Sequence, residues 1–358
     1  MPQTHRKNTN HKSPFVQNLL QVVLFKINCP KQRYSRPMLT AAGVLTIIIM
    51  VVGVLGNSLT IVALLRHSKL RTVAAAFIAS LCISDLMLCF LVLPFSASQF
   101  LHGTWIHGPM LCTMVPILRY GSVGVSLLSI TAISINRYIL IAWPHLYQTV
   151  YTKFKVAIYI GLIWAFSYSI QIPTMLGIWG TYGMDEKLGT CSIEPDEYGH
   201  SSKQFLFVMG TALPCIAIII CYAKIFWIVR QSHKKLQQNS TGNKFKRSEM
   251  KITKMVLAIF ICFIICYLPI TIVKVSDKEV HHAPLHTISY LLIYLSSCVN
   301  PLVYVTMNRQ YRMAYLDTLK CKYNSNLDSQ LTQPPASKSN NMAISYLKKV
   351  PASDSQKV

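Results

Sequence analysis

Ionisable side chains inside apolar segments carry most of the chemistry that this 358-residue chain offers. Asp85 is the only acid in the core of any apolar run, and Arg119 and Arg137 both lie within residues 112–143. Charged groups are costly inside a bilayer, and those that remain there pair, titrate or bind ligands. The types and spacing of these residues therefore predict ligand binding and a conformational switch.

Composition places these residues in a membrane protein. Hydrophobic residues make up 52% of the chain and charged residues only 13%, whereas a soluble domain carries about 25% charge. The net charge of +23 would suggest nucleic acid in a soluble protein. Here the basic residues cluster between apolar runs, which favours membrane topology and anionic lipid over nucleic acid. An enzyme is not predicted, because the runs hold no His-Glu-x-x-His and the chain holds no Gly-x-Ser-x-Gly.

The elements that position these residues are long apolar runs. Each is long enough for a tilted transmembrane helix, and backbone groups in lipid must bond internally. The predicted fold is therefore an all-α bundle of seven transmembrane helices. A transporter is the alternative for a bundle with intramembrane charges and prolines, but no inverted repeat is found. The runs are residues 39–66, 74–100, 109–141, 155–177, 204–230, 252–273 and 284–306.

Charge in the connections predicts the orientation. The connections after the first, third and fifth runs are basic, whereas those after the even-numbered runs lack Lys and Arg or hold lysines matched or outnumbered by acids. By the positive-inside rule the basic connections are cytoplasmic, which puts the N-terminus outside and the C-terminus inside a plasma-membrane protein. The basic tail before the first run argues the other way, but the later connections agree with one another.

The ends of the chain predict further segments around the seven-helix domain at residues 39–306. Residues 1–38 form an extracellular tail whose apolar patch, residues 18–25, is too short to span a bilayer and only faintly resembles a signal peptide. Residues 307–322 have the apolar spacing of an amphipathic helix on the membrane surface, with Cys321 a candidate for palmitoylation. Residues 323–358 have the composition of a disordered cytoplasmic tail.

Motifs in successive runs resemble those of the rhodopsin-like (class A) G-protein-coupled receptors, from about residue 40 to residue 321. The residues from 119 to 144 are further similar to the Moody and trapped-in-endoderm group of insect receptors, which are related to the melatonin receptors. Each motif alone is weak, but their order, one per helix, is specific. They are Gly56-Asn57, Leu81 to Asp85, Cys112 with Cys191, Asn136-Arg137-Tyr138, Trp164, Pro214 with Tyr222, and Asn300-Pro301-Leu302-Val303-Tyr304.

The resemblance implies roles for these residues. Cys112 and Cys191 would form a disulfide on the outer side, where disulfides persist, with free thiols as the alternative. The helix-packing and sodium-site motif would comprise Asn57, Asp85, Ser126, Ser296, Asn300 and Pro301. A sodium ion near Asp85 and a protonated, hydrogen-bonded Asp85 both fit a buried carboxyl group. No other metal or cofactor is expected.

The same resemblance assigns G-protein coupling to Asn136, Arg137, Tyr138, Tyr222 and Tyr304. Arg137 would hold the sixth helix when the receptor is inactive and meet a G-protein helix when it is active, whereas a snorkelling arginine is the structural alternative. Asn136 stands where the family usually carries aspartate. Because asparagine offers only hydrogen bonds, we expect a weaker inactive-state lock and higher basal signalling.

The expected ligand pocket is basic and aromatic. Arg119 lies where amine receptors carry aspartate, so a cationic amine would be repelled, and Tyr294 replaces the lysine that opsins need. Tyr267 stands where the family usually has tryptophan, which changes the detail of its rotamer switch. We expect a ligand with an anionic head and an apolar, lipid-like body, unless Arg119 pairs with Glu194 or another acid of the second extracellular loop. The pocket residues are Arg119, Tyr120, Tyr267, Thr271, Lys274, His286, Tyr290 and Tyr294.

The expected partners follow from the family. They are an extracellular ligand, a heterotrimeric G protein of the inhibitory type, receptor kinases and arrestin, the last two acting on phosphorylated Ser and Thr in the C-terminal tail. A receptor-fold protein that binds ligand without coupling to G proteins is the remaining alternative, but intact Arg137, Tyr222 and Tyr304 argue against it.

Overall fold

In the part of the chain that the structure describes, seven helical spans are long and apolar enough to cross a membrane, as the runs predict. The computed structural model describes residues 35–186, 189–235, 242–277 and 280–320. Residues up to Tyr315 belong to one compact unit, and the predicted seven-helix bundle is confirmed. The spans are formed by α2 (Arg36–Arg66), α3 (Val73–Leu91) with α4 (Leu93–His102), α5 (Gly108–Ala142), α7 (Lys153–Ser169) with α8 (Ile172–Met175), α9 (Lys203–Lys235), α10 (Gly242–Ser276) and α11 (Ala283–Met307).

Capping groups and prolines set the helix boundaries. Thr72 accepts a hydrogen bond from the backbone N–H of Ala75 at the start of α3, and Thr152 does the same for Lys155 in α7. The second and fourth spans each break into two helices, at Val92 and at residues 170–171. Pro94 and Pro173 lie just after these breaks, where a missing N–H and a fixed φ favour the first turn of a new helix.

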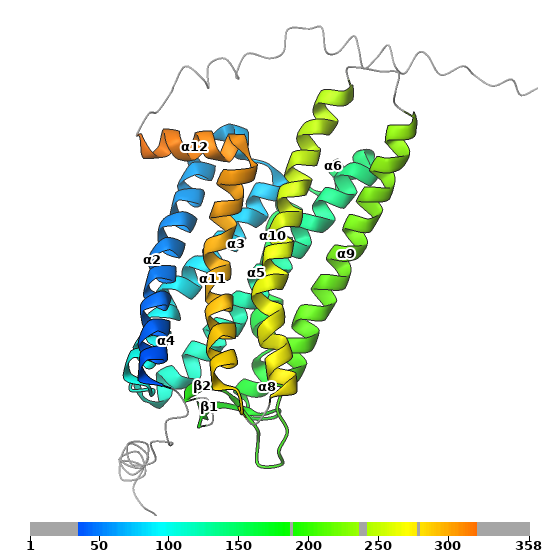
Figure 1. Cartoon of the computed structure of the whole chain (residues 1–358). Helices are drawn as coiled ribbons and strands as arrows, with labels where there is room; N and C mark the ends of the chain where they lie inside the picture. Colours follow the sequence, from blue (N-terminus) through cyan, green and yellow to red (C-terminus); the bar gives the residue numbers. More distant parts are fainter. Residues whose placement is uncertain (1–34, 187–188, 236–241, 278–279, 321–358) are drawn as a thin grey trace, which may run out of the picture. The chain divides into compact units, whose positions relative to one another are not determined.

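The helix α5 is the centre of the bundle. It packs against α3, α7, α9 and α10 and against both strands of the hairpin described below (Figure 1). Gly121 allows its close approach to α7, because a Cβ atom at this position would lie 2.3 Å from Tyr168 Cε1. On the outside of the bundle, apolar side chains such as Leu55, Leu65 and Trp227 are exposed, each by 65–67%. Exposed apolar surface on spans of this length is what lipid covers.

Two connections form elements that the sequence pattern did not predict. The short helix α6 (Pro144–Val150) follows α5. Between α8 and α9, β1 (Thr181–Asp185) and β2 (Thr190–Glu194) pair as an antiparallel hairpin, with Met184 opposite Cys191. The predicted disulfide joins Cys191 to Cys112 near the start of α5. Figure 1 shows the hairpin at the same end of the bundle as α8.

The amphipathic helix expected after the last span is α12 (Arg309–Leu319). Tyr311, Ala314 and Tyr315 are buried, and the Tyr315 hydroxyl lies 2.6 Å from Thr60 Oγ1 of α2. Leu319, the last residue of the expected apolar stripe, is 67% exposed. The N-terminal patch, Cys321 and the C-terminal tail lie outside the described residues, so the segment boundaries remain predictions.

Candidate functional site

A cavity of about 500 Å³ lies beside the middle of α5, from Arg119 to Thr131. This volume lies within the range of sites that hold small ligands. Most of its wall is apolar, and Arg119 is the charged residue among its lining side chains. The wall is built from α5 (Arg119, Tyr120, Leu127), α7 (Phe166, Ile170), α9 (Phe205, Met209, Leu213), α10 (Phe263, Tyr267) and α11 (Tyr290, Ile293) among others.

Arg119 is a buried cation, and no carboxylate among the described residues pairs with it. Its side chain is only 3% exposed, and Nε makes no hydrogen bond. Its guanidinium carbon lies 5.7 Å from the centroid of the Tyr290 ring, and Lys274 Nζ lies 5.3 Å from the same centroid. No described carboxylate lies within 4 Å of either cation. An unpaired buried charge is costly, so this end of the cavity is complementary to an anion.

The acids of the hairpin are held by a different cation. Lys203 Nζ lies 2.9 Å from Asp185 Oδ2 and 3.5 Å from Glu194 Oε1. Arg119 therefore does not pair with Glu194, which was the alternative to ligand binding. Burial and the neighbouring Asp185 carboxylate raise the pKa of Glu194 to about 7. Lys203 thus holds both hairpin carboxylates, and neither of them forms an ion pair with Arg119.

The hairpin is attached to the cavity wall at the end nearer the start of α5. Two cavity residues bond to it: the Tyr120 hydroxyl lies 3.3 Å from Ser192 Oγ, and Gln171 Oε1 accepts from the Tyr182 hydroxyl at 2.8 Å. From α4, Gln99 donates to the Gly189 carbonyl at 2.9 Å. With the disulfide, these bonds fix the hairpin to α4, α5 and α8.

The structure brings half of the predicted pocket residues to the cavity. Arg119, Tyr120, Tyr267 and Tyr290 line it, whereas Thr271, Lys274, His286 and Tyr294 do not. Thr271 instead donates to the Tyr267 carbonyl of its own helix. The Tyr294 hydroxyl donates to Ser96 Oγ at 3.1 Å and ties α11 to α4. Helical spacing predicts which side of a helix a residue lies on, but the contact partners of Thr271 and Tyr294 depend on how the helices pack.

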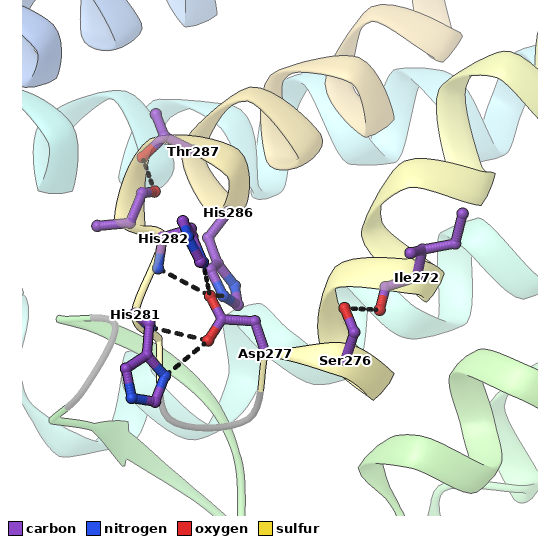
Figure 2. Close-up of polar contacts among 8 residues, drawn as sticks. Ile272, Ser276, Asp277, His281, His282, His286 and Thr287 are labelled. Atoms are coloured by element: carbon purple, nitrogen blue, oxygen red, sulfur yellow. Dashed lines mark hydrogen bonds and ion pairs between the residues drawn. The ribbon is translucent and has the colours of Figure 1, made fainter.

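His286 faces the loop between α10 and α11 (Figure 2). Its Nε2 lies 3.3 Å from Asp277 Oδ2. Asp277 also accepts the backbone N–H groups of His282 and His281, each at 2.8 Å. These bonds hold the pKa of Asp277 below its usual range, with the His282 amide the largest cause. Asp277 therefore fixes this loop and draws His286 out of the cavity wall.

A second, small cavity of about 10 Å³ surrounds Asp85. Asn300 Nδ2 donates to Asp85 Oδ2 at 2.8 Å, and Ser126 Oγ donates to Asp85 Oδ1 at 3.2 Å. Ser296 lines this cavity but bonds to the Ile293 carbonyl and the Tyr267 hydroxyl. The volume accommodates about one water-sized particle, and hard cations take carboxylate and neutral oxygen ligands. These residues therefore fit a small monovalent cation.

The C-terminal half of α5 holds a buried pair. Asn136 and Arg137 are 0% and 3% exposed. Asn136 Oδ1 accepts from Arg137 Nη2 at 2.7 Å and from Nε at 3.2 Å, while Asn136 Nδ2 donates to the Tyr147 hydroxyl at 3.2 Å. The asparagine therefore uses both ends of its amide, and it links Arg137 to α6. Tyr138 points elsewhere, with its ring 5.2 Å from that of Trp143.

The other residues predicted for coupling and helix packing each make contacts elsewhere in the bundle. Tyr222 of α9 donates to the Thr253 carbonyl of α10 at 3.1 Å. Tyr304 is fully buried against Tyr311, and its hydroxyl has no partner. Asn57 donates to the Ser297 carbonyl at 2.8 Å and ties α2 to α11. Gly56 fits against Pro301, whose Cβ and Cγ atoms would lie 3.0 Å from an added Cβ.

Sequence reasoning missed two parts of the site. Lys203 lies in the acid-rich connection just before the fifth run, and that imbalance of charge was the available signal for its ion pairs. On α9, Leu206, Gly210 and Pro214, which are four residues apart, line the cavity. Their spacing predicts a helix face but not what that face encloses.

The chain was compared with known proteins. The sequence profile of the family described as "7 transmembrane receptor (rhodopsin family)" matches residues 56–304. The G-protein coupled receptor moody of Drosophila melanogaster is 45% identical over 351 residues, which cover 81% of this chain and 52% of that protein. The protein trapped in endoderm-1 of Drosophila melanogaster is 36% identical over 76% of each chain. The neuropeptide Y receptor type 2 of Sus scrofa is 30% identical over 76% of this chain and 74% of that receptor. The chain spans about half the length of the moody receptors that it matches.

Proposed function

The chain belongs to the rhodopsin family of seven-transmembrane receptors, and on that premise we propose that it transmits the binding of an anionic, lipid-like ligand to a heterotrimeric G protein. The expected resemblance to the Moody and trapped-in-endoderm group is confirmed. Members of this family are receptors and not enzymes, and the seven apolar helices make the chain a multi-pass membrane protein.

One observation supports the ligand class: Arg119 is buried at a mainly apolar cavity and has no carboxylate partner. Lys274 is a second cation without a described carboxylate partner, and like Arg119 it lies near the Tyr290 ring. A ligand with one anionic group would supply the missing charge, and an apolar body would fill the remaining wall. A cationic amine in the cavity would meet the like charge of Arg119, and the cavity wall contains no described acid to offset it.

Coupling is assigned to the opposite half of α5. Asn136 and Arg137 would form the inactive arrangement, and release of Arg137 would open the surface that a G protein binds. We assign this end to the cytoplasm and the disulfide-bonded hairpin to the outside, because disulfides persist in oxidising compartments. The N-terminus is then outside and the C-terminus inside, at the plasma membrane. The family resemblance favours the inhibitory type of G protein, with kinases and arrestin acting on the C-terminal tail.

The test of ligand class uses matched sixteen-carbon probes in cells that express the receptor. Hexadecanoate, hexadecanol and hexadecylamine share one apolar body and differ in the charge of the head. We expect hexadecanoate alone to lower cyclic AMP, and Arg119→Gln to abolish its advantage over hexadecanol. Pertussis toxin should remove the response if the G protein is inhibitory. Equal responses to all three probes, unchanged by Arg119→Gln, would overturn the anionic-ligand proposal.

A further inference from the structure

The cavity beside Arg119 opens sideways between α7 and α9. Five of its lining residues also have exposed side chains: Phe166 and Ile170 on α7, and Phe205, Met209 and Leu213 on α9, with exposures of 37–58%. Both helices belong to membrane spans, and they make few direct contacts with each other, since α5 packs between them. Exposed apolar surface on these spans faces lipid. The opening therefore connects the cavity with the hydrocarbon of the bilayer.

The outer end of the same cavity is obstructed. Ser192 and Ile193 of β2 are fully buried, and β2 is tied to α5 by the disulfide. Tyr182 bonds to the cavity residue Gln171, while Lys203 joins the hairpin to the first turn of α9. These attachments come from α5, α8 and α9, so lifting the hairpin would break several of them together. A direct route from extracellular water therefore requires rearrangement, whereas the lateral opening is already present.

We propose that the natural ligand is a single-chain membrane lipid with an anionic head group, which reaches Arg119 through this lateral opening and leaves its acyl tail between α7 and α9. The proposal rests on the anionic ligand class inferred above and adds the route and the pose. An acyl chain that moves from the bilayer into an apolar passage stays in a hydrocarbon environment, so the tail pays little desolvation cost. The head loses its contact with the bilayer surface and gains the unpaired Arg119.

Gly210 provides a clean way to close the opening. It lies on the cavity face of α9 and is exposed, and an added Cβ atom there meets nothing within 4 Å. Gly161 is the matched control, because it is an exposed glycine of α7 that also meets nothing within 4 Å and does not line the cavity. Phenylalanine at either site adds the same apolar bulk to a helix. Only Gly210→Phe places that bulk in the opening.

The experiment measures labelling of the purified receptor in nanodiscs by a hexadecanoate that carries a mid-chain diazirine, with unlabelled hexadecanoate as competitor. Peptide mass spectrometry should locate the competed label on residues 166–170 and 205–213. We expect at least a tenfold loss of competed labelling in Gly210→Phe and no change in Gly161→Phe, at equal thermal stability. Leu213→Ala, which widens the opening, should speed labelling. Arg119→Gln should erase the preference for hexadecanoate over the matching diazirine alcohol.

The outcomes separate the route from the ligand class. Equal competed labelling in Gly210→Phe and Gly161→Phe overturns the lateral route, and the anionic-ligand proposal stands if Arg119→Gln still removes head-group preference. Loss of labelling in Gly210→Phe without any effect of Arg119→Gln supports the route and refutes the role of the arginine. Label on the hairpin instead of α7 and α9 contradicts the pose. If competed label is found at no site, both proposals are overturned.

Discussion

Asn136→Asp is the substitution that probes the switch most sharply. Asn136 Oδ1 accepts from two nitrogens of Arg137, at 2.7 and 3.2 Å, and both residues are buried. The cationic guanidinium already makes both bonds charge-assisted, and a carboxylate here would turn the contact into a buried ion pair with stronger attraction. It could still accept from Tyr147, whose hydroxyl is 3.2 Å from the present amide. The arrangement that holds Arg137 on α5 should therefore become more stable.

The expected stabilisation of the inactive arrangement is the gain from the stronger bonds minus the cost of burying the new charge. Hydrogen bonds to charged groups contribute about 1.5–3 kcal/mol, and desolvation of the carboxylate offsets part of this gain. A net gain of about 1.4 kcal/mol shifts the equilibrium between inactive and active forms tenfold. Ligand-independent G-protein activation by Asn136→Asp should accordingly fall about tenfold at matched surface expression, measured by nucleotide exchange in membranes.

Tyr147→Phe is the control for this prediction. It removes the acceptor of Asn136 Nδ2 without changing charge, so the amide loses one bond that orients it. Basal activation should rise by no more than about tenfold, because one neutral hydrogen bond contributes about 0.5–1.5 kcal/mol. If Asn136→Asp leaves basal exchange at the wild-type level, the reasoning about a weakened lock is refuted.

Three further perturbations test other parts of the molecule. Cys112→Ser should lower the free energy of unfolding by about 2–4 kcal/mol, because the disulfide closes a loop of 79 residues, and thermal denaturation in detergent would measure it. Lowering the pH from 8 to 6 should protonate Glu194, whose pKa is about 7, and so increase the net positive charge near Arg119. Binding of hexadecanesulfonate, which stays ionised, should then tighten about two- to fivefold, and Glu194→Gln should remove that change; a pH response that persists in this variant would assign it to another group. If sodium occupies the cavity at Asp85, agonist affinity should depend on sodium in the wild type and not in Asp85→Asn, whereas sodium independence of both would favour a protonated, hydrogen-bonded carboxyl group.

Hydropathy predicted the spans, because the requirement for internal backbone bonding leaves an apolar run of this length little choice but a helix. The break at Val92 follows from Pro94, and the disulfide follows from family resemblance. The hairpin and α6 escaped prediction, since both are short segments with no strong period. Their structure depends on tertiary bonds, such as the one between Tyr182 and Gln171.

The sequence predicted the types of residue at the candidate site better than it predicted which residues contact one another. Arg119 and Tyr290 come together as the sequence suggested. The sequence could not show whether Arg119 pairs with an acid of the hairpin. The answer depends on Lys203 of α9, which forms ion pairs with Asp185 of β1 and Glu194 of β2. His286 shares a helix with Tyr290, but the loop residue Asp277 determines its orientation. Which cation pairs with which carboxylate is decided by tertiary packing, and a local sequence pattern does not encode it.

The central claim is that α5 connects a cavity that binds an anion with a surface that activates a G protein. The most direct measurement is hexadecanoate-stimulated nucleotide exchange on purified inhibitory G protein, with the wild type, Arg119→Gln and Arg137→Ala receptors compared at equal amounts in nanodiscs. We expect stimulation by the wild type, competed binding of the hexadecanoate probe by Arg137→Ala without stimulation, and loss of both carboxylate preference and stimulation in Arg119→Gln. Stimulation that persists in Arg137→Ala, or a wild type that binds the probe without any exchange, would contradict it.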